Sequence, residues 1–254
     1  MTVVQIRLDR DVVCVQGTDA EKYLHSQLSN DVQGMAVGSS RWSLLLEPTG
    51  KLIAVVRVTR FEDTVFMLDT ERGVGDDVVT RLNRFRIRVA ATVERLDWQC
   101  VALRGEGARV VAPVRPPSDG RIVDAWWPEG VDAAVDLIGA SVADVEGVAP
   151  ADAAAYDALR VSAGWPIMGV DFAQGCIPAE TGLVGIAVSF SKGCYPGQEL
   201  VERMDSRATN APFSLRVVDD AGYAVGDQPF EGATVTSVGG GRAIVRVRRG
   251  AGDA

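Results

Sequence analysis

The sequence has few residues of the types that hold metal ions. Among 254 residues there is one histidine, His25, and four cysteines: Cys14, Cys100, Cys176 and Cys194. No two of the cysteines form a Cys-x-x-Cys pair. Structural zinc and iron–sulfur sites generally use three or four cysteine or histidine ligands, with at least one close pair. The sequence therefore predicts no metal held by the protein itself.

Two further shortages narrow the class of protein. No apolar run approaches the roughly 18 to 20 residues that cross a membrane, and the opening MTVVQIRLDR has charges where a signal peptide has an apolar stretch. Basic residues number 26 against 34 acidic residues, for a net charge of −8. Such a chain has no general affinity for nucleic-acid phosphates, although a local basic patch can exist. We expect a cytoplasmic protein without membrane binding, for which direct binding of nucleic acid is not favoured.

The first part of the chain has the pattern of an α+β unit. Apolar runs at 12–17, 41–47, 51–58 and 64–69 predict strands, and their turns favour hairpins. Apolar spacing predicts helices over 19–28 and 73–85. The stretch 85–89 alternates, which predicts a strand with Phe85, Ile87 and Val89 facing inward. Its arginines, Arg84, Arg86 and Arg88, would face outward; as a minor hypothesis they contact the glutamate tail of folate or an RNA phosphate.

The second part is less regular until residue 150. Strand-like runs occur at 100–105, 108–114 and 121–127, and a helix is expected between Pro150 and Gly164. Short alternating runs rich in glycine follow residue 207 and predict a small β-barrel. The glycines at 238–242 lie between two such runs, which is typical of a hairpin turn and not of a phosphate loop.

Cys194 is the cysteine with the strongest chemical case. It lies in KGCYPGQELVERM, two residues after Lys192 and just before an expected helix at 198–204. A nearby cation and a helix N-terminus both favour the thiolate over the thiol. The alternative is a small buried side chain, which is what the apolar surroundings of Cys14 and Cys100 indicate for those residues. A dyad of Cys194 with His25 is a weaker hypothesis, because the sequence does not place the two side chains together.

Several stretches carry a resemblance to a known family. ALRVSAGWPIMGVDF and IPAETGLVG resemble the tetrahydrofolate-binding core of the glycine-cleavage T-protein superfamily. SFSKGCYPGQELVER resembles the signature of its YgfZ-type branch, which includes mitochondrial iron–sulfur assembly factors. Weaker likeness extends upstream through YLHSQLSNDV, LEPTGKL and NRFRIRV, so the resemblance covers most of the chain.

The resemblance implies an α+β fold in three parts: residues 1–95, residues 96–206 with the signature, and a C-terminal β-barrel at 207–254. It implies tetrahydrofolate or a one-carbon derivative as the cofactor, bound between the first two parts. Glu180 would accept hydrogen bonds from the pterin edge, and Trp42, Leu45 or Trp165 would supply an apolar slot. Gln198 is the other expected folate-binding residue, while Lys192 and Cys194 are the candidate catalytic residues of the signature.

One departure from the family bears on activity. T-proteins that transfer an aminomethyl group have an aspartate on the strand after a Gly-Gly turn, where this chain has Ala54 and Val55. Apolar side chains cannot support the attacking folate nitrogen electrostatically. The favoured function is therefore a folate-binding accessory protein for iron–sulfur cluster assembly or repair, including in tRNA-modifying enzymes, with iron–sulfur proteins or assembly factors as partners. The alternatives are a one-carbon transferase on another substrate and a hydrolase with Cys194 as nucleophile.

Overall fold

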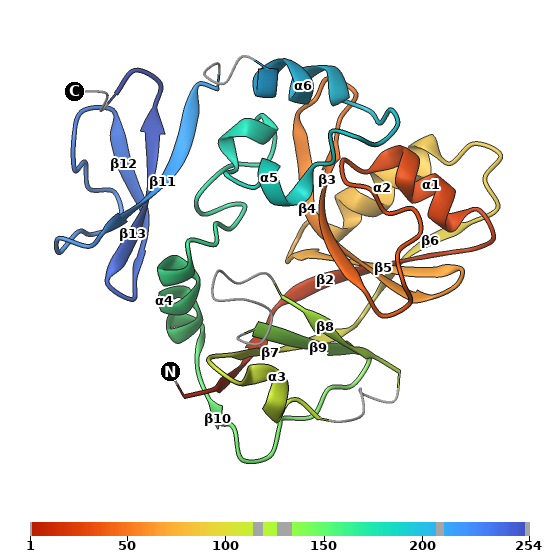
Figure 1. Cartoon of the computed structure of the whole chain (residues 1–254), viewed down its shortest axis with the longest axis horizontal. Coiled ribbons are helices and arrows are strands. Elements are labelled where there is room, and N and C mark those ends of the chain that lie inside the picture. Colours follow the sequence, from red (N-terminus) through yellow and green to blue (C-terminus); the bar gives the residue numbers. More distant parts are fainter. Residues whose placement is uncertain (1, 114–118, 126–133, 207–210, 252–254) are drawn as a thin grey trace. The chain divides into compact units, whose positions relative to one another are not determined.

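The computed structural model describes residues 2–113, 119–125, 134–206 and 211–251, with helices and strands along the whole chain (Figure 1). The chain divides into two compact units, each assembled from three separate segments. The first comprises Met1–His25, Val32–Trp42 and Val56–Tyr156, and the second Ser26–Asp31, Ser43–Val55 and Asp157–Ala254. Helix α1 (Ala20–Gln27) and strands β3 (Ser40–Leu46) and β4 (Leu52–Glu62) have residues in both. The three-part division expected at residues 95 and 206 stays a prediction.

One five-stranded sheet of the first unit has the order β10-β1-β7-β9-β8. Its strands are β1 (Val4–Leu8), β7 (Gln99–Arg104), β8 (Arg121–Asp124), β9 (Ala134–Gly139) and β10 (Ala149–Pro150). Neighbours are antiparallel except for the parallel pair β1 and β10. The short helix α3 (Ala108–Val111) lies against β7 and β9. Strand β9 is buried along its whole length, as expected of a strand covered on both faces.

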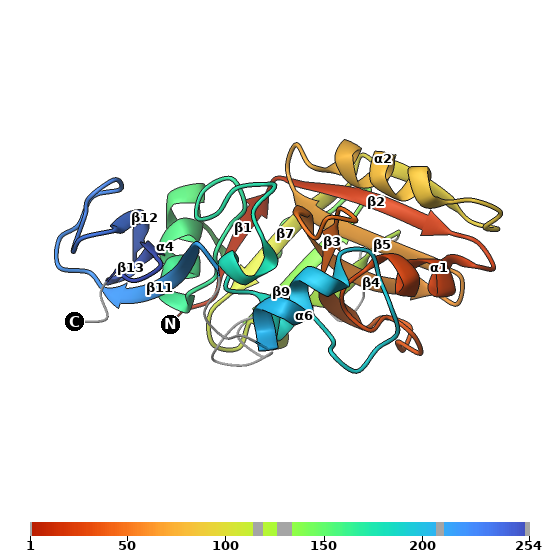
Figure 2. The same cartoon turned by 90° about the horizontal axis from the view of Figure 1, so that it is seen from above.

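A second five-stranded sheet has the order β3-β4-β5-β2-β6. Its remaining strands are β2 (Arg10–Gln16), β5 (Val65–Glu71) and β6 (Thr92–Leu96), and the pairs β2–β5, β2–β6 and β4–β5 are antiparallel. Helix α2 (Gly75–Phe85) packs against β2, β5 and β6 (Figure 2). Val78 and Leu82 of α2 are fully buried, which is the apolar face that the helical spacing predicts.

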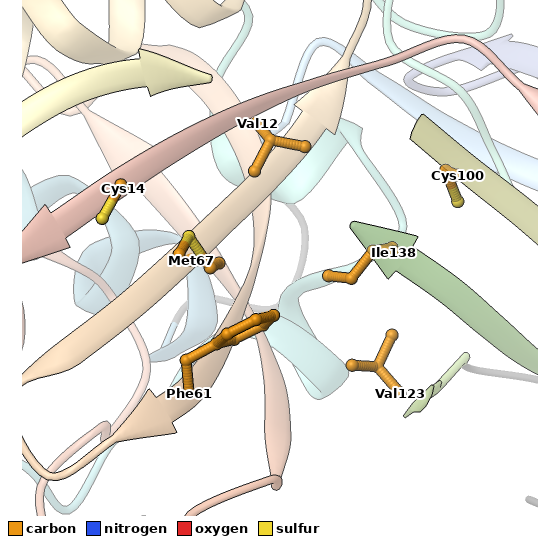
Figure 3. Packing of buried hydrophobic residues seen from close by; sticks show 7 residues of the cluster. All are labelled: Val12, Cys14, Phe61, Met67, Cys100, Val123 and Ile138. Atoms are coloured by element: carbon orange, nitrogen blue, oxygen red, sulfur yellow. The ribbon is translucent and has the colours of Figure 1, made fainter. Parts of the chain in front are cut away.

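The core of the first unit is built from side chains of both sheets. Figure 3 shows one buried cluster, made of Val12, Cys14, Phe61, Met67, Cys100, Val123 and Ile138. The members come from β2, β4 and β5 of one sheet and from β7, β8 and β9 of the other. The prediction that Cys14 and Cys100 are small core residues is confirmed.

A buried network of ion pairs adjoins this core. Arg57 of β4 donates to Asp69 of β5 from Nε at 2.9 Å and to Asp136 of β9 from Nη1 at 2.5 Å. Arg104 of β7 donates to the other oxygen of Asp136 at 2.7 Å, and Arg10 donates to Asp69 at 2.9 Å. Burial alone would raise the pKa of Asp136, but the charges of Arg104 and Arg57 outweigh it and lower the pKa to about 2.

The second unit holds the remaining elements. They are the greater part of α4 (Ala153–Ala163), the 3-10 turn η2 (Pro178–Glu180), α5 (Val184–Ala187), α6 (Gln198–Ser206), β11 (Phe213–Asp219), β12 (Ala233–Gly239) and β13 (Arg242–Arg248). The three strands form an antiparallel sheet in the order β11-β13-β12, with a small apolar cluster at Ala233, Val235, Ala243, Val245 and Val247. Within the described residues these strands do not close into a barrel, so the C-terminal barrel stays a prediction.

Two sequence-based element predictions are wrong. Residues 85–89 are not a strand: α2 continues to Phe85, and the chain then bends through Arg88, which has a φ of 56°. The ring of Phe85 lies against Arg81 of its own helix, and Ile87 is 75% exposed, so strand alternation fails. The run at 108–114 begins instead as helix α3 after Gly107, whose φ is 81°. Residues 114 and 126–127 of the expected strands lie outside the described residues.

The other element predictions in these regions are confirmed. The expected early strands correspond to β2, β3, β4 and β5, and the expected helices to α1, α2, α4 and α6. The glycine run at 238–242 is the turn between β12 and β13, where Gly240 and Gly241 have φ values of 59° and 78°. Such values suit a tight hairpin turn, in which glycine carries no side-chain penalty.

Candidate functional site

The signature loop, residues 188–197, joins α5 to α6 in the second unit and is fixed by Lys192. The Lys192 ammonium donates to the carbonyl oxygen of Leu28 at 2.6 Å and to that of Asn30 at 3.4 Å, and lies 5.1 Å from the centre of the Tyr195 ring. Burial lowers the pKa of Lys192 to about 8, although the charge of Asp31 opposes the shift. The lysine expected as a cationic neighbour of Cys194 therefore also anchors the loop to the segment 28–31.

The segment 28–31 is itself bound to the end of α5. Ser29 Oγ donates to the carbonyl oxygen of Ala187 at 2.7 Å, and Asn30 Nδ2 donates to that of Ile186 at 3.1 Å. The Ser189 amide donates to the Ser29 carbonyl at 3.1 Å. In the sequence, the LSND run stands out only as part of a resemblance, which does not predict that Ser29 and Asn30 bind the end of α5. Its signal was two short polar residues placed directly after a helix, where side chains commonly bond to backbone groups.

Two glycines let the backbone of the site pack closely. Gly50, at φ 85°, has no room for a side chain, because a Cβ there would lie 2.5 Å from Cβ of Leu200 on α6. A Cβ on Gly197, at φ 86°, would lie 2.8 Å from the carbonyl oxygen of Glu47. The turn at 47–50 therefore fits directly against the start of α6. These close approaches explain the glycine in each of the stretches TGK and PGQ.

Tyr195 and Gln198 complete the loop where α6 begins. Tyr195 is 7% exposed, and burial, followed by the charge of Glu202, raises its pKa to about 12. Gln198 Oε1 accepts a hydrogen bond from the Tyr195 amide at 3.3 Å, while Gln198 Nε2 donates to Glu202 at 2.6 Å. The Gln198 amide, expected at the folate, is thus used in the structure to cap its own helix.

Cys194 is the exposed member of the four cysteines. Burial raises the pKa of Cys14 to about 11 and, together with the charge of Glu180, that of Cys176 to about 12. The pKa of Cys100 is raised further, since its thiol is enclosed in the core. Because the thiolate is the reactive form, the raised pKa protects all three thiols, and Cys14 and Cys100 are buried as well, whereas Cys176 is half-buried. Reactivity is therefore expected at Cys194.

Glu180 ends the 3-10 turn η2 and is half-buried. Burial raises the pKa of its carboxyl, and the positive charge of Arg246 on β13 partly opposes this. The turn is held by Thr181, whose hydroxyl donates to the Pro178 carbonyl at 2.7 Å. Glu180 is therefore a partly desolvated carboxylate on a rigid support, which suits an acceptor of hydrogen bonds from a ligand.

The two tryptophans expected to line a pterin slot lie in different surroundings. Trp165 is 6% exposed. Its backbone N–H donates to the Arg160 carbonyl oxygen, and its carbonyl oxygen accepts from the Arg160 guanidinium. The same guanidinium donates to buried Asp171 at 2.8 Å. Trp42 belongs to the first unit and is half-buried, with the guanidinium carbons of Arg10 and Arg57 at 5.7 and 5.5 Å from its ring. Leu45 is fully buried.

The positions that would carry the transferase acid are apolar and enclosed. Ala54 is 0% exposed and Val55 is 6% exposed on β4. Among the described residues no group of three or more histidine, cysteine, aspartate or glutamate side chains could hold a metal ion. Nor does the described part of the chain include a helix long and apolar enough to cross a membrane. His25 is half-buried on α1 in the first unit, and its pairing with Cys194 stays a hypothesis.

Comparison with known proteins defines the class of this chain. Residues 11–116 match the GCVT N-terminal domain. The fold is that of the glycine cleavage system aminomethyltransferase T from Bartonella henselae: the TM-score is 0.80 at 18% identity, over 97% of this chain and 78% of the other. Residues 11–116 thus resemble the GCVT N-terminal domain, and the chain shares the fold of that aminomethyltransferase.

The chain is also similar, at low identity, to the YgfZ proteins. It is 25% identical over 221 residues to the tRNA-modifying protein YgfZ of Enterobacter sp. strain 638, covering 80% of this chain and 67% of that protein. It is 25% identical over 228 residues to the protein of the same name from Cronobacter sakazakii, covering 83% and 69%. An uncharacterized protein of Haemophilus influenzae is 27% identical over 218 residues, covering 84% and 73%.

Proposed function

We propose that this chain is a tetrahydrofolate-binding accessory protein that supports iron–sulfur cluster assembly or repair in other enzymes, including tRNA-modifying ones. The observation that carries the proposal is the signature loop, which is held rigidly by Lys192 and presents the exposed thiol of Cys194. Distant relatives carry the name tRNA-modifying protein, which fits a role beside such enzymes. In this proposal the protein acts in the cytoplasm and binds iron–sulfur proteins or assembly factors.

Glu180 is the residue that fits a folate best. A pterin presents an amine and a ring N–H on one edge, and a half-buried carboxylate accepts two such hydrogen bonds well. The apolar wall expected from Trp42 or Trp165 stays a prediction, because Trp165 is almost fully buried and Trp42 belongs to the other unit. Since the Gln198 amide is engaged in its own helix, its part would be to shape the loop. The folate itself would supply any one-carbon chemistry.

Calorimetric titration with tetrahydrofolate and with its 5-formyl form tests the folate proposal directly. Glu180→Gln keeps the shape but places a donor against the N–H groups of the ligand. A charge-assisted hydrogen bond is worth roughly 1.5–3 kcal/mol, so affinity should fall about ten- to a hundredfold. Glu199→Gln, at an exposed site on α6, is the matched control and should bind normally. Equal affinities for the two variants would remove Glu180 from the site.

The main alternative is a folate-dependent one-carbon transferase on another substrate. The buried apolar pair Ala54 and Val55 speaks against aminomethyl transfer, because no carboxylate stands at either position. Incubation with aminomethylated H-protein and tetrahydrofolate should therefore release no ammonia. Ammonia release in proportion to protein concentration would favour the transferase instead. A hydrolase with Cys194 as nucleophile is a third candidate, for which the structure offers an exposed thiol but no assigned base.

A further inference from the structure

The chain that follows α2 presents an unusual surface. Here we define the Ile87 loop as residues 84–89, which lead from the last turn of α2 toward β6. Ile87, at its centre, is 75% exposed. Arg84 and Arg88 on either side are exposed as well. The loop therefore combines an open isoleucine with exposed arginines one and three residues away in the chain, and the Arg84 guanidinium lies 5.7 Å from the centre of the Phe85 ring.

The Ile87 loop is held in place at both ends. Arg86 Nε donates to Asn83 Oδ1 at 3.0 Å, and Arg86 Nη1 donates to the carbonyl oxygen of Ala91 at 2.7 Å. Ala90, the residue that follows the loop, is bound twice by Asp19. The Asp19 carboxylate accepts from the Ala90 backbone N–H at 2.8 Å, and the Asp19 backbone N–H donates to the Ala90 carbonyl oxygen at 3.2 Å. These bonds span the loop, so Ile87 is displayed on a fixed frame.

The backbone of the loop is strained. Arg88 is the one non-glycine residue of the described chain with a positive φ, at 56°. This conformation is unfavourable for a residue with a Cβ and persists only where the surroundings impose it. Residues held in this way are concentrated at functional surfaces, where the strain fixes a particular presentation. The strain at Arg88 turns the chain immediately after Ile87.

The charge of the Ile87 loop is not neutralised within the described structure. Neither Arg84 nor Arg88 forms an ion pair with a carboxylate of the described residues, although the whole chain has a net charge of −8. A partner with carboxylates would be attracted to this point of an otherwise acidic protein. In such a complex the exposed isoleucine would be covered by an apolar surface of the partner.

We propose that the Ile87 loop is a docking surface for a partner protein with a small apolar pocket edged by carboxylates. Ile87 would enter the pocket, and Arg84 and Arg88 would pair with the carboxylates. Protein interfaces have this arrangement of an apolar anchor with arginine near it. Nucleic acid fits less well, because a phosphate backbone offers no apolar surface for Ile87 and the net negative charge of the chain repels phosphates. The inference is independent of folate binding.

Site-specific photocrosslinking in cells tests the surface. A benzophenone amino acid replaces Ile87 in one variant and Val225, which is 67% exposed, in a matched control. We expect a protein adduct from position 87, and a yield at least tenfold lower from position 225. The crosslinked peptides of the partner should contain both apolar and acidic residues. Arg84→Glu with Arg88→Glu should reduce the adduct at least tenfold, whereas Arg249→Glu, at another exposed arginine, should not. Replacing the mapped carboxylates of the partner by lysine should restore the adduct of the double variant.

Several results would overturn the proposal. They are an adduct removed by nuclease, an adduct to lipid, equal yields from positions 87 and 225, and failure of the reciprocal charge exchange to restore the adduct. Melting temperature and tetrahydrofolate affinity are measured on the same double variant. Both should be unchanged, which separates a lost docking surface from a misfolded chain. A loss of folate affinity in this variant would assign the arginines to the ligand instead and would contradict docking.

Discussion

The guanidinium of Arg57 and the carboxylate of Asp136 join two different sheets of the first unit through a 2.5 Å hydrogen bond. Arg57 is 1% exposed and also binds Asp69, so its charge is neutralised inside the core. Buried ion pairs of this kind add little net stability over apolar residues of the same shape. Removing one partner is different, because buried carboxylates then lose charged hydrogen-bond donors, and here only Arg10 remains for Asp69 and Arg104 for Asp136.

Arg57→Met should therefore strongly destabilise the protein. It leaves Asp69 and Asp136 short of a hydrogen-bonding cation, and the expected loss is about 3–5 kcal/mol of the free energy of unfolding. Urea denaturation followed by circular dichroism measures it. Arg72→Met is the control, since Arg72 pairs with Asp9 at the surface and its loss should cost only about 0–1 kcal/mol. Similar losses of unfolding free energy for the two variants would show that burial does not make the Arg57 ion pairs more important than a surface pair.

The pKa of Asp136 predicts a pH dependence. Its folded pKa, about 2, is below that of an unfolded aspartate, so ionised Asp136 stabilises the fold. This contribution, about 2–3 kcal/mol, is complete above about pH 5 and is lost progressively as the pH falls through the folded pKa of about 2. Between pH 6 and pH 3 the unfolding free energies of the unsubstituted chain and of Asp136→Asn should therefore draw closer by about 1 kcal/mol. A gap that stays constant over this range would contradict the assignment.

Side chains at Gly50 and Gly197 should disturb the signature loop. Gly50→Ala and Gly197→Ala each place a Cβ within 3 Å of other atoms at a positive φ. The left-handed conformation alone costs about 1–2 kcal/mol for alanine, and the clash adds to it. Gly185→Ala on α5 is the control, because nothing lies within 4 Å of a Cβ there and alanine favours helices. Thermal melting should show losses for the first two variants and no loss for the third.

Brief alkylation at pH 8 should label Cys194 at least about a hundredfold faster than the other three thiols, because Cys14 and Cys100 are buried, Cys176 is half-buried, and the pKa of all three is raised. Mass-spectrometric mapping identifies the labelled site. Cys194→Ser should alter stability by no more than about 0.5 kcal/mol, as for most exposed positions. It should nevertheless abolish support of iron–sulfur enzymes in cells, whereas exposed Ser191→Ala, the nearby control, should not. An unlabelled Cys194, with a serine variant that melts several degrees lower, would show that this thiol is structural.

Local patterns along the chain predicted most of the elements but few of the contacts. Helix α2 followed from Val78 and Leu82, and the hairpin β12–β13 from its glycines. The expected strand at 85–89 failed because alternation over five residues cannot show that a preceding helix continues to Phe85. At Ile87 and Arg88 the sequence contains no sign of the positive φ that turns the chain.

The candidate site shows the same limit. Cys194 was identified from its neighbours in the chain, and its exposure agrees with a reactive thiol. The carbonyl partners of Lys192 lie 164 and 162 residues away, at Leu28 and Asn30, and no local pattern can indicate them. The hydrogen bonds of the Gln198 side chain with Tyr195 and Glu202 are local in sequence. They nevertheless depend on the side-chain conformation that the loop imposes. Long-range hydrogen bonds thus define the site beyond what the motif alone indicates.

The interleaving of the two units along the chain has a consequence for synthesis on the ribosome. All segments of the first unit have been made once Tyr156 is complete, yet 26–31 and 43–55 belong to a unit whose third segment, Asp157–Ala254, follows later. Leu44, Leu45 and Leu46, which are fully buried in the folded protein, all lie in the segment 43–55. A nascent chain therefore carries an apolar stretch that lacks the rest of its unit until Asp157–Ala254 has been made. Chains stopped early should consequently be prone to aggregation and chaperone binding.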